Sequence, residues 1–142
     1  MTKKKLFSAS RSFIRANLML RNFNKTDSRF HITDFNHYLT DPQGIYFCLW
    51  YALLFNVLEF LDEEKLTPLQ IKKEVKEVFT PLKKFRNAVL HPQASYFDKR
   101  FEFMLNENYF KKVQHIHNEL SNYFDAELAT YGEETRIELQ SP

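Results

Sequence analysis

Glycine is almost absent from this chain of 142 residues, in which Gly44 and Gly132 are the only two. Folds rich in β-hairpins need many tight turns, so this scarcity argues against a β-rich architecture. It also excludes the glycine-rich phosphate loops of the two common nucleotide-binding motifs. Cys48 is the only cysteine, which excludes an intrachain disulfide and a zinc site made of several thiolates.

A continuous apolar run of transmembrane length is missing as well. The longest strongly apolar stretch, which contains no charged residue, extends from Ile45 to Leu58. A transmembrane helix needs roughly 20 apolar residues, so we interpret this stretch as a central helix buried on most sides, partly against a second copy of the chain. The basic N-terminus is not followed by the apolar segment and cleavage site of a signal peptide. We therefore expect a cytoplasmic protein that does not enter a membrane.

Hydrophobic residues make up 44% of the chain and aromatic residues 16%, which is too apolar for a disordered protein. The length fits one domain with a core of its own. We expect this domain to cover residues 1–132, and residues 133–142 to form a disordered acidic tail.

Positive charge is concentrated near the N-terminus. Residues 1–30 contain eight basic residues and one acidic residue, Asp27, whereas the remainder contains twelve basic and seventeen acidic residues. A basic arm on an acidic body is typical of proteins that bind a polyanion. The alternative is an arm that is only solvated.

Three predicted helix starts combine a capping side chain with a proline, which suits the first helical position. They are Asp41-Pro42, Thr67-Pro68 and Thr80-Pro81. After Thr67, the spacing to Gln70 also matches a capping box. Together with the central apolar run, these signals predict an all-α fold, an up-and-down bundle of four to five helices.

The helical periodicities place the elements along the chain. In the first helix we expect Ile14, Leu18 and Phe7 on one face, the buried one. We expect Gly132 to end the last helix in a left-handed conformation. The expected helices cover about residues 8–21, 45–58, 68–79, 81–90, a short segment from Asp98, and 107–130, with a long connection at 22–40.

The segment Phe85 to Pro92 contains the strongest candidate site. On the helix that it predicts, Arg86 lies at the border between the apolar stripe and solvent. His91 is followed by Pro92, which disfavours helical backbone at the preceding residue. We therefore expect the helix to stop at about Leu90, and His91 to leave the helical path and turn back towards the side of Arg86.

Such a pair suits phosphoryl chemistry, because histidine exchanges protons and arginine stabilises charge on phosphoryl oxygens. No convincing metal cluster is present in the sequence, so the reaction it favours is metal-independent cleavage of RNA. His91 would take the proton of a ribose 2′-hydroxyl or protonate the leaving oxygen, and Arg86 would stabilise the phosphorane. DNA lacks that hydroxyl.

The string Arg86-Asn87-Ala88-Val89-Leu90-His91 resembles the Arg-polar-x-x-x-His signature of HEPN domains. The resemblance covers roughly residues 42–130. It implies a four- or five-helix bundle, a homodimer with a composite cleft, and ribonuclease activity in a toxin or phage-defence setting, with an antitoxin protein as a further partner. It also implies that Arg86 and His91 are catalytic and that Asn87 orients them or contacts RNA, with no cofactor.

Further residues near the motif are candidates for RNA contacts. They are Lys83, one turn before Arg86, and Tyr96 and Arg100 in the segment after it. The chain departs from the family at Gln93. HEPN toxins that are paired with a nucleotidyltransferase antitoxin usually have tyrosine two residues after the histidine.

Other interpretations remain open. In the first of these interpretations, Arg86 pairs with an acid such as Glu59 in a purely structural role, and His91 only caps its helix. The domain is then a non-catalytic HEPN-like module that binds RNA, a nucleotide or a protein, or a plain helical oligomerisation protein. His115 and His117 point to opposite sides of their helix, so they are not expected to chelate a metal together. Trp50 and Tyr51 are expected in the core or a dimer interface.

Overall fold

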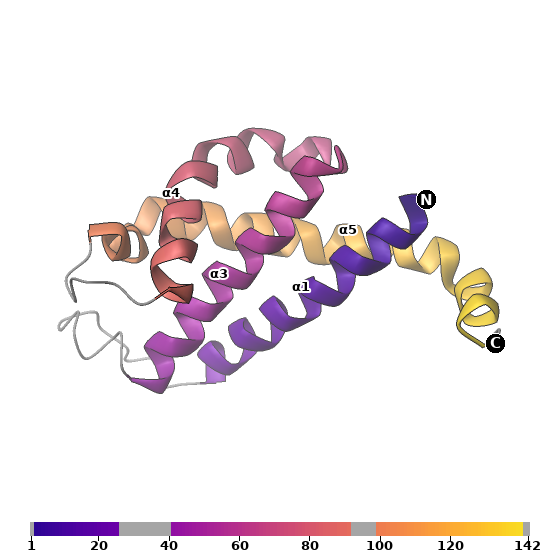
Figure 1. Cartoon of the computed structure of the whole chain (residues 1–142), viewed down its shortest axis with the longest axis horizontal. Coiled ribbons are helices and arrows are strands. Elements are labelled where there is room, and N and C mark those ends of the chain that lie inside the picture. Colours follow the sequence, from indigo (N-terminus) through magenta and orange to yellow (C-terminus); the bar gives the residue numbers. More distant parts are fainter. Residues whose placement is uncertain (1, 26–40, 92–98, 141–142) are drawn as a thin grey trace.

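The computed structural model describes residues 2–25, 41–91 and 99–140, with side chains up to Ala129 except those of Thr2, Met104 and Leu105. Over these residues the fold is all-α, with four helices packed against each other and no strands, as the sequence predicts (Figure 1). The elements are α1 (Thr2–Lys25), α3 (Pro42–Glu63), η1 (Leu69–Ile71, a 3-10 helix), α4 (Lys72–Leu90), η2 (Lys99–Leu105, a 3-10 helix) and α5 (Glu107–Gln140).

Helix α3 is the central element, and its start confirms the predicted cap. The Asp41 side chain accepts a hydrogen bond from the Gln43 amide, and Pro42 occupies the first helical position. The helix is long and apolar enough to cross a membrane, yet most of its apolar stretch is buried within the described fold. Helices α1 and α4 both pack against it.

Helix α1 is longer than expected, and the predicted buried face is wrong. Ile14 and Leu18 are 64% and 53% exposed. The face that packs on α3 and α5 combines large side chains with two alanines, which leave room for close packing of the helices. The periodicity of the large aliphatic residues alone did not reveal this face. Its buried members are Leu6, Ala9, Phe13, Ala16 and Leu20.

The two helices expected over 68–79 and 81–90 are one helix, α4, with Pro81 in its interior. Thr80 is therefore not a cap. A proline inside a helix removes one backbone hydrogen bond and bends the axis, and α4 changes direction midway in Figure 1. Thr67 is not a cap either, since η1 begins without a side-chain cap and the Thr67 hydroxyl has no hydrogen-bond partner in the described structure.

Helix α5 begins at Glu107, as the sequence predicts, but it does not end at Gly132. No glycine in the described residues has a positive φ, so Gly132 does not provide the expected left-handed end. Residues 133–140 continue as helix, which corrects the expectation of a disordered tail from residue 133. The expected connection over 22–40 is helical as far as Lys25, and its remainder lies outside the described residues.

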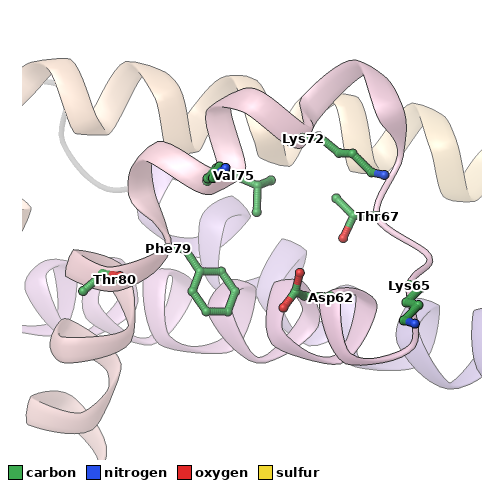
Figure 2. A pocket seen from close by; sticks show the side chains of 8 residues that line it. Asp62, Lys65, Thr67, Lys72, Val75, Phe79 and Thr80 are labelled. Carbon is green, nitrogen blue, oxygen red and sulfur yellow. The ribbon is translucent and has the colours of Figure 1, made fainter.

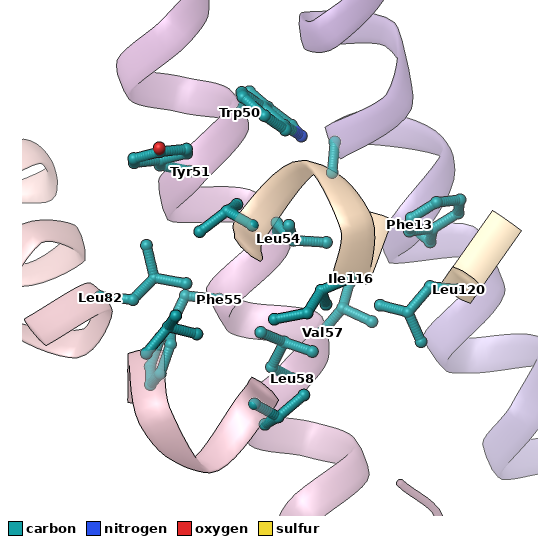
Figure 3. Packing of buried hydrophobic residues seen from close by; sticks show 14 of the residues in the cluster. Phe13, Trp50, Tyr51, Leu54, Phe55, Val57, Leu58, Leu82, Ile116 and Leu120 are labelled. Carbon is teal, nitrogen blue, oxygen red and sulfur yellow. The ribbon is translucent and has the colours of Figure 1, made fainter. Parts of the chain in front are cut away.

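The core forms where all four helices meet, as Figure 3 shows around α3. Phe13 of α1, Leu82 of α4 and Ile116 of α5 contribute to one cluster with the buried side of α3. Trp50 and Tyr51 are fully buried in it, which confirms their expected place in the core. Burial also raises the pKa of the Cys48 thiol to about 12, so this thiol is a packing group within the fold.

Candidate functional site

His91 lies where the sequence predicts a change of backbone direction. Helix α4 ends at Leu90, and His91 is extended, with φ −125° and ψ 136°. Pro92 accounts for this, because a residue before proline avoids helical backbone. The imidazole therefore lies beyond the last helical turn at the C-terminal end of α4, and the residue is exposed.

Arg86, one turn before this end, is held by three side-chain oxygens. Its Nη1 donates to Asn56 Oδ1 at 2.9 Å and to Glu59 Oε1 at 3.0 Å, both on α3. Its Nε donates to Asn87 Oδ1 at 3.0 Å. The guanidinium is thus fixed in one orientation by acceptors on both sides of the helix contact.

The aromatic ring of Phe55 packs against the face of the same guanidinium. The Arg86 carbon Cζ lies 4.7 Å from the centroid of the Phe55 ring, within cation–π distance. The Arg86 side chain is only 15% exposed. Its Nη2 makes no hydrogen bond to the residues that the structure describes, so two N–H donors remain for a ligand.

The ion pair with Glu59 confirms the partner that the sequence predicts for Arg86. Asn56 is the partner that sequence reasoning missed. A signal for it exists, because Asn56 is the strongly polar residue within the apolar run and precedes Glu59 by three positions. That spacing puts both side chains on one face of α3.

The remaining candidates are distributed differently. Lys83 is exposed on α4, three residues before Arg86 and so on a neighbouring part of the helix surface. Asn87 contacts Arg86 directly. Tyr96 lies outside the described residues. The expected contacts of Lys83 and Asn87 with RNA stay predictions.

Arg100 lies on another side of α4. With Lys84 and Lys99 it lines a hollow of about 280 Å³ between η2 and α4. Lys84 and Arg86 are two residues apart on one helix, so they point to roughly opposite sides. Within one copy of the chain, Arg100 therefore does not join Arg86.

His117 is buried, whereas His115 is exposed, as their spacing predicts. Trp50 Nε1 donates to His117 Nδ1 at 3.1 Å, so the ring hydrogen is on Nε2, which lies 3.1 Å from Asn17 Oδ1. Burial lowers the pKa of His117 to about 4, so it is neutral at physiological pH. This neutral link joins α1, α3 and α5 through polar groups inside the core.

No cluster of three or more histidine, cysteine, aspartate or glutamate side chains lies together in the parts of the chain that the structure describes. The groups at the end of α4 are instead a fixed cation and an exposed imidazole. An arginine with spare N–H donors is able to bind an anionic oxygen, and an imidazole is able to exchange a proton. The expected turn of His91 towards the side of Arg86 stays a prediction.

No protein-family model, curated protein or solved structure matches this chain. The resemblance to HEPN domains consequently depends on the motif from Arg86 to His91 and on the order of the helices.

Proposed function

We propose that this protein is a metal-independent endoribonuclease of the HEPN type that uses Arg86 and His91. The observation that carries the proposal is the state of the Arg86 guanidinium. It is fixed at three hydrogen bonds, retains two donors on Nη2, and lies one turn before the helix end that presents His91. A fixed guanidinium with spare donors stabilises a phosphorane without reorganisation during the reaction.

The reaction uses the ribose itself as nucleophile. His91 takes the proton from the 2′-hydroxyl, and the resulting oxygen attacks the adjacent phosphorus. Arg86 Nη2 donates to a non-bridging oxygen of the phosphorane. The bond from phosphorus to the 5′-oxygen breaks, and that oxygen is protonated as it leaves. The products are a 2′,3′-cyclic phosphate and a 5′-hydroxyl.

The proposal includes a homodimer of up-and-down, HEPN-like bundles in the cytoplasm, in which two motifs form one cleft. One histidine then acts as the base and the other as the acid. A toxin or phage-defence role follows from the resemblance, with an antitoxin protein as a partner.

The surface charge of α1 supports RNA as the substrate. This helix contains seven basic residues and no acidic residue. Arg11, Arg15, Arg21 and Lys25 are all exposed along it. A row of exposed cations attracts a phosphate backbone regardless of its sequence.

A second candidate function is a non-catalytic HEPN-like module that binds RNA, a nucleotide or a partner protein. The ion pair between Arg86 and Glu59 favours it, because Glu59 already neutralises the cation. In that case Arg86 fastens α4 to α3, and His91 has no chemical role.

The two functions are separated by incubating the purified protein with a labelled RNA beside His91→Ala and Arg86→Lys. Lysine keeps the charge of Arg86 and cannot make the same planar set of hydrogen bonds. We expect His91→Ala to lower the cleavage rate by about 10²–10⁴-fold, the range for lost acid–base catalysis. His115→Ala is the matched control, because His115 is an exposed histidine on α5.

Circular dichroism and urea unfolding establish that each variant is folded. Equal cleavage rates of the wild type and His91→Ala would contradict the enzyme proposal. RNA binding by the wild type without any cleavage would contradict it as well. The latter result, with affinity lowered by Arg86→Lys, supports the binding module.

A further inference from the structure

A cavity of about 580 Å³ lies between the end of α3 and the first half of α4 (Figure 2), and its lining does not include His91. Its volume falls within the range of small-molecule pockets, roughly 300–1,000 Å³. Thr67 and Asp62 project into it from the turn and from α3, and the Phe79 ring lies at its other end. The lining residues are Asp62, Lys65, Thr67, Lys72, Val75, Lys76, Phe79 and Thr80.

The charge of this lining is positive. Three of the lining residues are lysines, Lys65, Lys72 and Lys76, and one is an acid, Asp62. None of the three ammonium groups forms an ion pair with the residues that the structure describes. The neighbouring acid Glu64 is paired with Lys5 of α1, so it does not neutralise them.

An unpartnered hydroxyl supports a ligand at the same place. The Thr67 oxygen is buried, and it has no hydrogen-bond partner among the described residues, although the sequence places it where a helix cap is expected. A buried polar atom without a partner is costly, and a ligand oxygen within the cavity would satisfy it. Thr80 is a second threonine in the lining of the same cavity.

The apolar part of the lining indicates a ligand that is larger than a free inorganic ion. Val75 and Phe79 form one wall, and the Phe79 ring packs against Phe55 at 4.9 Å between centroids, which fixes its position. A ligand that matches both parts has an anionic head and a flat or apolar body.

We propose that this cavity binds a small organic phosphate, with the phosphate between the lysines and Thr67 and the body against Phe79. A phosphate monoester has a charge of about −1.5 to −2 at neutral pH, which complements three cations and one anion. Lysines bind phosphate as point charges and need no fixed fork geometry. The site does not include Arg86 or His91, so it does not depend on ribonuclease activity.

The test is isothermal titration of the full-length protein at low salt with adenosine monophosphate as the probe, beside adenosine and inorganic phosphate. We expect the monophosphate to bind, inorganic phosphate to compete with it, and adenosine to bind at least about tenfold more weakly. Lys72→Gln and Lys76→Gln should each weaken binding by about five- to tenfold. Lys84→Gln, an exposed lysine elsewhere on α4, should leave it unchanged.

Two further variants distinguish a phosphate site from a general effect on the fold. Asp62→Asn removes the one carboxylate, so it should tighten binding. Lys65→Gly removes a cation from a residue with a positive φ of 58°, which glycine adopts more easily. It should raise the melting temperature and weaken binding at once, whereas a damaged fold would lower both.

Several outcomes overturn the proposal. They are no binding of the monophosphate, equal binding of adenosine, no effect of Lys72→Gln and Lys76→Gln, or weaker binding after Asp62→Asn. Binding of an RNA oligonucleotide that depends on Lys72 and Lys76, without binding of the monophosphate, makes the cavity part of an RNA interface and also overturns it.

Discussion

At the scale of single residues, Glu59 has two effects on Arg86. It neutralises a guanidinium that is mostly buried, and it fixes that guanidinium against α3. Loss of the carboxylate leaves a poorly solvated cation without its charged partner, although Asn56 still accepts one of its hydrogen bonds.

We therefore expect Glu59→Ala to lower the free energy of unfolding by about 1–3 kcal/mol in urea. Glu63→Ala is the matched control, because Glu63 is an exposed glutamate on the same helix. Its effect should stay within about 0.5 kcal/mol. Equal effects of the two substitutions would mean that the ion pair contributes nothing to stability.

His117 makes the stability of the fold depend on pH. Its folded-state pKa is lowered by burial from the usual 6.5 to about 4. Between these values the unfolded chain binds a proton that the folded chain excludes. The free energy of unfolding therefore decreases as the pH falls from 6.5 to 4, by at most about 1.4 kcal/mol per pH unit from this group.

His117→Gln should flatten this slope, because glutamine does not titrate and still offers hydrogen-bonding groups to Trp50 and Asn17. Urea unfolding at pH 7, 6 and 5 measures the slope. His115→Gln is the control and should retain the wild-type slope, since His115 is exposed. A slope that persists in His117→Gln would assign the pH-dependence to other groups.

At the scale of elements, the end of α3 shows a lysine in a position that suits glycine. The Leu66 amide donates to the Leu61 carbonyl at 2.8 Å and the Lys65 amide to the Asp62 carbonyl at 3.1 Å, the two bonds of a Schellman motif. This motif requires left-handed backbone at Lys65, whose φ is 58°.

Lys65→Gly should therefore raise the free energy of unfolding by up to about 1 kcal/mol, because left-handed backbone is costly for a residue with a Cβ. Lys84→Gly, in the regular part of α4, should lower it by about 1 kcal/mol. Chemical denaturation of both variants checks the opposite signs. A loss of stability in Lys65→Gly would refute this account of the turn.

The basic face of α1 leads to a prediction about RNA affinity. We expect the double variant Arg11→Gln and Arg15→Gln to weaken RNA binding and to reduce the slope of log affinity against log salt by about 1–2. Its matched control is the double variant Lys73→Gln and Lys111→Gln, which removes two exposed cations from other helices. Equal losses in both would show that only net charge matters.

The sequence predicts the elements best where one local signal is strong. The Asp41 cap, the start of α5 and the end of α4 before Pro92 all follow from chemistry within a few residues. The continuation of α4 through Pro81 does not follow from local chemistry, because tertiary packing of α4 on α3 outweighs the preference of proline for a helix start.

The candidate site divides in the same way. The end of α4 before His91 and the pairing of Arg86 with Glu59 were predictable, because each follows from a neighbouring proline or from the need of a buried cation for an acid. The contact of Arg86 with Phe55 and the cavity at Lys72 depend on how the helices pack. Periodicity within one helix contains no information about that packing.

At the scale of the whole molecule, the fold places two kinds of surface around one core. The last turns of α4 present Arg86 where it contacts α3, while α1 presents a row of cations. The proposed homodimer joins two such molecules, so that one cleft contains two motifs. The proposed cleavage therefore requires an imidazole and a guanidinium that act on the same phosphate of RNA.

The most direct measurement is the identity of the ends that the protein leaves on a labelled RNA of defined sequence. If the proposed mechanism operates, we expect a 2′,3′-cyclic phosphate and a 5′-hydroxyl, cleavage that persists in the presence of a chelator, and no cleavage at a nucleotide whose 2′-hydroxyl is replaced by hydrogen. A 5′-phosphate with a 3′-hydroxyl, or cleavage at the deoxy position, would contradict it.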